Sequence, residues 1–76
     1  MTLFEKLKDI IGLGWQVKFS SFGAQFIVIV SKIDDDENIF VKESHLPLQD
    51  HFTESKIINC IEWSISEIEK CYAKEN

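Results

Sequence analysis

The segment Gln25–Ile33 restricts the folds open to this chain more than any other, because it is apolar on both faces of a strand. In an extended conformation, successive side chains point to opposite sides. One side then carries Phe26, Val28 and Val30, and the other carries Ile27, Ile29 and Ile33. Strands of this kind are typical of the middle of a sheet that is covered on both sides. The sequence therefore predicts a sheet with this segment at its centre.

Two shorter segments are predicted to pair with this central strand. Trp15–Ser20 alternates between apolar and polar residues, as a half-buried strand does. A turn at Ser21–Gly23 follows, in which Gly23 accepts a positive φ. After the polar loop Asp34–Asn38, the segment Ile39–Glu43 is expected to form a third, short strand. These local connections favour an antiparallel meander.

A helix is predicted before the sheet, over Thr2–Ile11. Its apolar residues lie within about 120° of one another on a helical wheel. They are Leu3, Phe4, Leu7, Ile10 and Ile11. Thr2 and Glu5 have the spacing of a capping box, in which each side chain satisfies a free backbone N–H of the first turn. Gly12 is expected to end the helix in a left-handed conformation.

A longer helix is predicted after the sheet, over Phe52–Lys74, with Asp50 or Thr53 as its N-cap. Its apolar residues form a single stripe at helical spacing. The stripe consists of Ile57, Ile58, Ile61, Ile65, Ile68 and Tyr72. This helix therefore has one face for a core and one face for water.

The predicted fold class is α+β, with the element order α-β-β-β-α and both helices packed on one face of a three-stranded antiparallel meander. The 76 residues are expected to form a single domain over positions 1–76. The element order resembles that of double-stranded-RNA-binding domains. Their last helix opens with a lysine cluster, whereas Thr53–Lys56 contains one lysine and one glutamate, so that binding chemistry is absent.

Two helices on one face leave the other face of the sheet without cover. If Ser20 pairs with Gln25, then Ile27, Ile29 and Ile33 stand on the uncovered face. Exposing an isoleucine forgoes about 1.5–3 kcal/mol, and a small domain has roughly 5 kcal/mol of stability in total. We therefore predict that a protein partner, or a second copy of the chain, contacts these three isoleucines.

The register of the second hairpin stays open at this point. One register directs Phe40 to the uncovered face, and the other directs Ile39 and Val41 there. Phe40 is therefore included among the predicted partner-contact residues.

Trp63 is a second candidate contact. The helical wheel places it opposite the apolar stripe, and tryptophan is enriched at the energetic centres of protein interfaces. Lys56, Cys60 and Glu67 share its side of the helix and complete the predicted contact patch. Two structural alternatives are that Phe4 of the first helix packs over the indole, or that lysine stems cover it.

No arrangement of residues in the sequence predicts a metal or catalytic centre. The loop that begins at Asp34 lacks the glycine and the glutamate of an EF-type calcium loop. Cys60 and Cys71 lie about 16 Å apart on one helix, too far for a shared zinc ion or an intramolecular disulfide. His51 has no nucleophile and orienting acid at the required spacing. We therefore expect no enzyme activity, no metal and no cofactor.

The charge balance argues against nucleic acid as a partner. The chain has 13 acidic residues, eight lysines, no arginine and a net charge of −5, whereas nucleic-acid binding needs a basic surface. No segment is long and apolar enough to predict a membrane span. The charges within Met1–Gly12 argue against a signal peptide. Together with two unpaired cysteines, this favours a cytoplasmic protein.

These features favour a small, acidic, non-enzymatic protein-interaction module that self-associates, for example as a homodimer. The alternative is an acidic inhibitor or immunity-type protein that occupies the basic groove of a nucleic-acid-handling enzyme or a toxin, as anti-CRISPR and anti-restriction mimics do. A composition rich in Ile, Lys and Asn fits an AT-rich bacterial or phage genome. A mimic, however, needs carboxylates spread over one face, whereas Asp34–Glu37 concentrates four in one loop.

Overall fold

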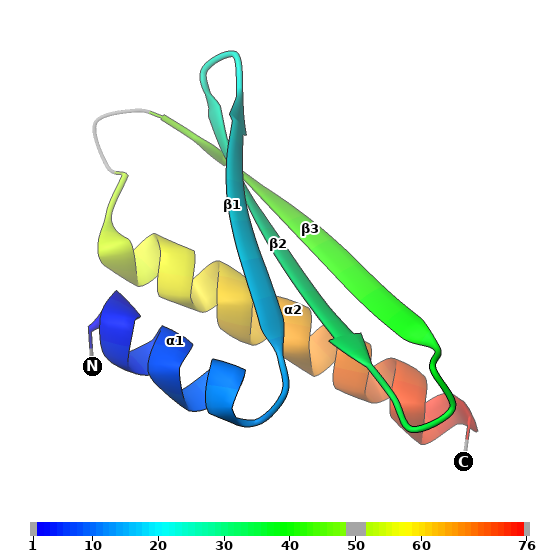
Figure 1. The fold of residues 1–76 in the computed structure, drawn as a ribbon. Coiled ribbons are helices and arrows are strands. Elements are labelled where there is room, and N and C mark those ends of the chain that lie inside the picture. Colours follow the sequence, from blue (N-terminus) through cyan, green and yellow to red (C-terminus); the bar gives the residue numbers. More distant parts are fainter. Residues whose placement is uncertain (1, 49–51, 76) are drawn as a thin grey trace.

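The computed structural model describes residues 2–48 and 52–75. Its elements follow the order α1 (Leu3–Gly12), β1 (Gln16–Phe22), β2 (Gln25–Ile33), β3 (Ile39–Pro47) and α2 (Glu54–Glu75) (Figure 1). The three strands form an antiparallel sheet in the order β1-β2-β3. The predicted α+β fold, with its α-β-β-β-α order and β2 in the middle, is confirmed.

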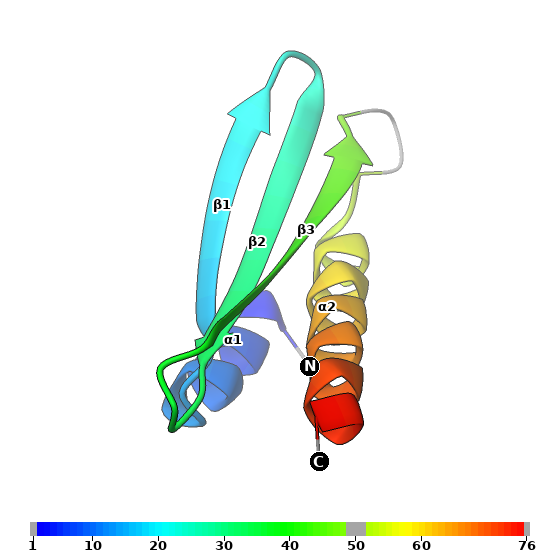
Figure 2. The same ribbon diagram turned by 90° about the vertical axis from the view of Figure 1, so that its right-hand side faces the viewer.

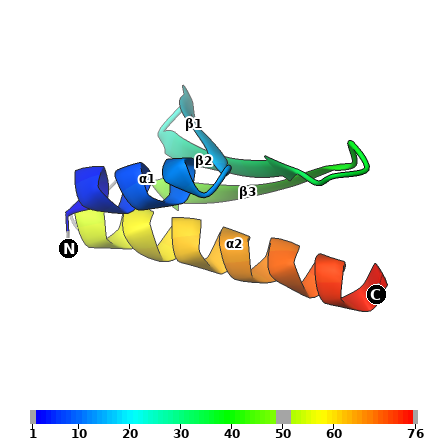
Figure 3. The same cartoon turned by 60° about the horizontal axis from the view of Figure 1, so that its bottom comes forward.

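Both helices lie on the same side of the sheet (Figures 2 and 3). Helix α2 packs against β2 and β3, whereas α1 contacts α2 and β1. The core between the two layers consists of Ile10, Trp15, Val28, Val30, Ile57, Ile61 and Ile68. Ser64 of α2 is also fully buried, and its hydroxyl lies 3.4 Å from that of Ser44 on β3. The predicted apolar stripe of α2 therefore faces the sheet.

The first hairpin closes with a two-residue turn in which Gly23 has a φ of +60°. Phe22, not Ser20, pairs with Gln25, so the predicted register is wrong by two residues. Because side chains alternate with a period of two, this shift leaves every side chain of β1 on its predicted face. The division of β2 into a core face and an uncovered face therefore survives the correction.

The second hairpin decides which side chains of β3 face outward. Phe40 pairs with Lys32, which shares the face of the buried Val30, so Phe40 lies on the helix side and packs against the core. Ile39 and Val41 take the outward positions instead. The prediction that Phe40 contacts a partner on the uncovered face is therefore wrong, because the register gives this side chain to the core.

The loop between β2 and β3 is organised by the carboxylate of Asp34. Its Oδ1 accepts hydrogen bonds from the backbone N–H of Asp36 at 2.9 Å and of Asn38 at 2.8 Å. Its Oδ2 accepts a third from the side-chain amide of Asn38 at 3.1 Å. Desolvation raises the pKa of Asp34, but the hydrogen bonds lower it more, so the pKa lies below its ordinary value. Glu37 adopts a left-handed φ of +66° within this loop.

The side chains of Thr2 and Glu54 accept hydrogen bonds from backbone N–H groups at the start of α1. The Thr2 hydroxyl accepts a hydrogen bond from the N–H of Glu5 at 3.2 Å, as the capping motif predicts. Oε1 of Glu54, on α2, accepts the N–H of Leu3 at 2.8 Å. One free backbone N–H in the first turn of α1 is thus paired by a side chain of α2, and this hydrogen bond links the two helices.

The end of α1 differs from prediction, whereas the N-cap of α2 is one of the two residues predicted for it. Helix α1 continues through Gly12, and the positive φ of +95° falls at Gly14, so the predicted left-handed stop at Gly12 is wrong. At the start of α2, the hydroxyl of Thr53 accepts the N–H of Lys56 at 3.4 Å, which makes Thr53 the cap. Asp50, the other predicted cap, lies outside the described residues, as does the side chain of Tyr72.

Glu37→Gly is expected to raise the free energy of unfolding by about 0.5–1 kcal/mol. Glycine adopts a left-handed conformation without a Cβ clash, although its greater freedom in the unfolded chain offsets part of the gain. Urea unfolding measures the difference. Asp36→Gly is the matched control, because Asp36 has no positive φ, and it should lower stability. A Glu37→Gly protein less stable than the original would contradict the loop geometry.

The β2–β3 loop is expected to loosen in acid. Because the folded pKa of Asp34 lies below its ordinary 3.8, the ionised carboxylate stabilises the loop fully above this pH. This contribution is lost as the pH falls through the lower, folded pKa. An NMR titration should show the backbone amides of Asp36 and Asn38 shifting together in that window, and Asp34→Asn should abolish the shift. A midpoint above 3.8 would rule out the hydrogen-bonded carboxylate.

Candidate functional site

The sheet has one face without a helix, which we call the outer face. In Figures 2 and 3, α1 and α2 both lie on the opposite side. The register places the odd-numbered residues of β2 and β3 and the even-numbered residues of β1 on the outer face. The core residues of β2 lie on the opposite face. No element in the described part of the chain covers this face.

An apolar patch occupies the outer face. We define it by Ile27, Ile29, Ile33, Ile39 and Val41. Ile33, Ile39 and Val41 are 50%, 65% and 52% exposed, whereas Ile27 and Ile29 are partly buried by their neighbours. Ile33 and Ile39 pair directly across the two strands. The predicted outward orientation of Ile27, Ile29 and Ile33 agrees with this arrangement, and their contact with a partner stays a prediction.

Polar side chains surround the apolar patch. Lys18 and Glu43 lie on either side of Ile29, on β1 and β3. The ring of His45 is held between two side chains, with Nδ1 3.1 Å from Oε1 of Gln25 and Nε2 3.4 Å from Oε2 of Glu43. The outer face therefore has an apolar centre and a polar rim, which is the arrangement of a protein interface.

The predicted patch on α2 lies on a separate surface, on the helix side of the sheet. Trp63 is 49% exposed, and Nζ of Lys42 on β3 lies 5.8 Å from the centroid of its ring. Lysine cover is thus correct in part, although it comes from a strand. Lys56 is exposed, Cys60 packs partly against the core and Glu67 pairs with a lysine one turn later at 3.1 Å. The structure does not bring this patch together with the isoleucines.

Sequence reasoning missed exposed apolar residues on α1. Phe4 and Ile11 belong to the predicted apolar stripe, yet both are exposed, as is Leu13 after the helix. This ten-residue helix contacts its neighbours along one side only, and that side carries Ile10. Helical periodicity could not separate the two sides, because all five stripe residues fall within one arc of the wheel. The alternative in which Phe4 covers Trp63 has no support, since Phe4 is 76% exposed.

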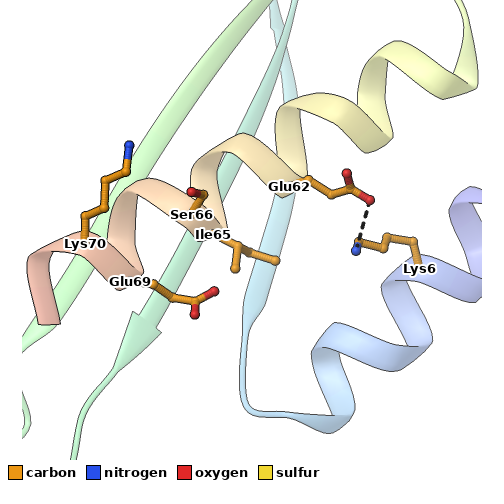
Figure 4. A pocket seen from close by; sticks show the side chains of 6 residues that line it. All are labelled: Lys6, Glu62, Ile65, Ser66, Glu69 and Lys70. Carbon is orange, nitrogen blue, oxygen red and sulfur yellow. Dashed lines mark ion pairs between the residues drawn. The ribbon is translucent and has the colours of Figure 1, made fainter. Parts of the chain in front are cut away.

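An open depression of about 440 Å³ lies between α1 and α2 (Figure 4). Its lining consists of Lys6, Glu62, Ile65, Ser66, Glu69 and Lys70. Nζ of Lys6 lies 3.2 Å from Oε1 of Glu62, so an ion pair between the helices crosses the depression. The lining contains no histidine or cysteine. We interpret it as a product of helix packing.

The chemistry of the described residues outside this depression is also limited. Within residues 2–48 and 52–75, no group of three or more His, Cys, Asp or Glu side chains is arranged to hold a metal ion. Cys60 and Cys71 are both free thiols. None of the described helices combines the length and apolarity needed to cross a membrane.

Comparisons of the chain with protein-family models, with curated proteins and with solved structures gave no match. The outer face is therefore interpreted from its own geometry, burial and charge.

Trp63→Ala is expected to lower the free energy of unfolding by only about 1 kcal/mol, since the indole is half exposed and its cation–π contact is at the surface. Trp15→Ala is the matched control, because Trp15 is 6% exposed and its loss should cost about 3–5 kcal/mol. Urea unfolding of both variants measures the two values. Equal losses at the two positions would show that Trp63 is packed as deeply as Trp15.

Proposed function

We propose that this chain is a small, non-enzymatic protein-interaction module that binds its partner through the outer face. The observation that carries the proposal is the apolar patch on a sheet face that no described element covers. Burying an exposed aliphatic side chain contributes about 1.5–3 kcal/mol when burial is complete. Three half-exposed and two partly buried residues of this kind on one face offer a part of that free energy for association.

The polar rim supports the same function. A partner that excludes water from the patch leaves Lys18, Glu43 and His45 at the edge, where charged groups keep part of their hydration. Charges in this position guide orientation and association rate more than they add affinity. The surface is thus suited to selecting one partner geometry.

An acidic inhibitor that mimics nucleic acid is the alternative function. Such a protein needs free carboxylates directed at the basic groove of its target. In the acidic loop, however, the carboxylate of Asp34 accepts three hydrogen bonds from its own loop. This arrangement gives less support to mimicry than the apolar patch gives to the interaction module.

Site-specific photo-crosslinking in the cells that make the protein tests the proposed function. A photoreactive phenylalanine analogue in place of Ile39, which lies in the apolar patch, should give covalent protein adducts. The same analogue in place of Ile11 is the matched control, because Ile11 is similarly exposed, at 55% against 65%, but lies on α1. Adducts from Ile39 alone support the outer face as the binding surface. Equal adducts from both positions, or none from Ile39, would overturn the proposal.

A further inference from the structure

The charges of the outer face are arranged asymmetrically about the middle of the sheet. Lys18 on β1 pairs with Ile29 on β2, and Ile29 pairs with Glu43 on β3. These three residues form one row across the sheet, at the midpoint of β2, which we call the charged row. Read from β1 to β3, the row is positive, apolar and negative.

The two rows between the charged row and the first hairpin have edge positions of similar chemistry on β1 and β3. Phe22, Gln25 and Pro47 form the row at the hairpin end, so both outer positions are apolar. Between this row and the charged row lie Ser20, Ile27 and His45, and both edge positions carry side chains that can form hydrogen bonds. The edge positions on β1 and β3 thus match in chemistry in these two rows, whereas Gln16 and Val41, which share the row of Ser31, differ.

A rotation of 180° about an axis parallel to β2 exchanges the two edges of the sheet and keeps each row at its own level. A second copy placed in this way would bring its Glu43 over Lys18 and its Lys18 over Glu43, with the two Ile29 side chains at the axis. Phe22 would meet Pro47 at one end. The outer face is therefore complementary in charge to a rotated copy of itself.

We propose that the occupant of the outer face is a second copy of this chain, packed face to face about a two-fold axis parallel to β2. This inference rests on the proposed function and names its partner. Packed sheets lie about 10 Å apart, which the long side chains of Lys18 and Glu43 bridge at the rim. The helices of both copies remain on the outside, so the dimer has four layers.

The competing two-fold arrangement is less favourable. An axis in the plane of the face, perpendicular to the strands and passing through Ile29, would place Lys18 over Lys18 and Glu43 over Glu43. Like charges opposed at an interface destabilise it. The charged row therefore favours the parallel axis, although both arrangements place Ile29 at the axis.

The size of the face sets the expected strength of the dimer. Nine residues of a strand span about 30 Å, and three strands span about 14 Å. The resulting footprint of about 400 Å² per copy is in the range of weak, exchanging interfaces. We therefore expect monomer and dimer to exchange at micromolar to submillimolar concentrations.

Sedimentation equilibrium of the full chain tests the dimer and its orientation. Lys18→Glu and Glu43→Lys each place like charges together twice in the dimer, so each should weaken dimerisation about tenfold. Both residues are exposed, so the fold should persist, and thermal unfolding at low concentration checks this. The double variant K18E/E43K restores both opposite-charge pairs and should recover the dissociation constant of the original chain. An equimolar mixture of the two single variants should form a heterodimer.

The outcomes separate this inference from the proposed function. A chain that stays monomeric throughout the concentration range overturns the second copy as occupant, and adducts from Ile39 to another protein would still support the interaction module. A dimer whose dissociation constant is insensitive to both single substitutions, or is not recovered in K18E/E43K, overturns the parallel axis. Weakening by each single change with recovery in the double variant supports it, because neither the perpendicular axis nor a loss of fold produces that pattern.

Discussion

Both faces of β2 are apolar, but the described elements of the chain cover only one of them. Val28 and Val30 are fully buried beneath the helices, and this requirement places α2 against β2 and β3. Ile27 and Ile29 have the same chemistry on the opposite face, where only the side chains of neighbouring strands shield them. The hydrophobic effect does not distinguish between the two faces. Folding of one chain therefore removes one half of β2 from water, and the proposed association removes the other.

The packing of the two helices explains why neither of them covers the outer face. Helix α1 is held against α2 at two polar contacts, from Glu54 to the N–H of Leu3 and from Lys6 to Glu62. It is short, and its contact with the sheet is confined to β1. An element anchored in this way beside α2, on the helix side of the sheet, cannot also reach the outer face. The exposed Phe4 and Ile11 are a consequence of the same anchoring, since α1 buries only the side that meets its neighbours.

Period-two alternation made the faces of the sheet predictable, although the exact pairing was not. A shift of two residues in the first hairpin changed partners and left the faces intact, so Ile27 and Ile29 were correctly assigned. Phe40 could not be assigned, because a one-residue difference in the second hairpin reverses its face. The extension of β3 to Pro47 was also hidden, since its second half, Ser44–Pro47, has Leu46 as its one aliphatic side chain and ends in a proline, which is disfavoured in strands. Contacts distant in sequence, such as Glu54 with Leu3, leave no local pattern to recognise.

The charged row favours one orientation of a second copy, which the apolar patch alone does not do. Burial of isoleucine is non-directional, so an apolar face alone would accept several orientations of a partner. Lys18 and Glu43 stand at opposite edges of the same row and make those orientations unequal. The net charge of −5 on each chain opposes close approach in all of them. An arrangement that places two opposite-charge pairs at the rim offsets this repulsion at short range, where paired groups at the edge of an apolar contact are less screened than charges in open solvent. Specificity in this small protein would thus reside in two exposed side chains, while the isoleucines between them provide the affinity.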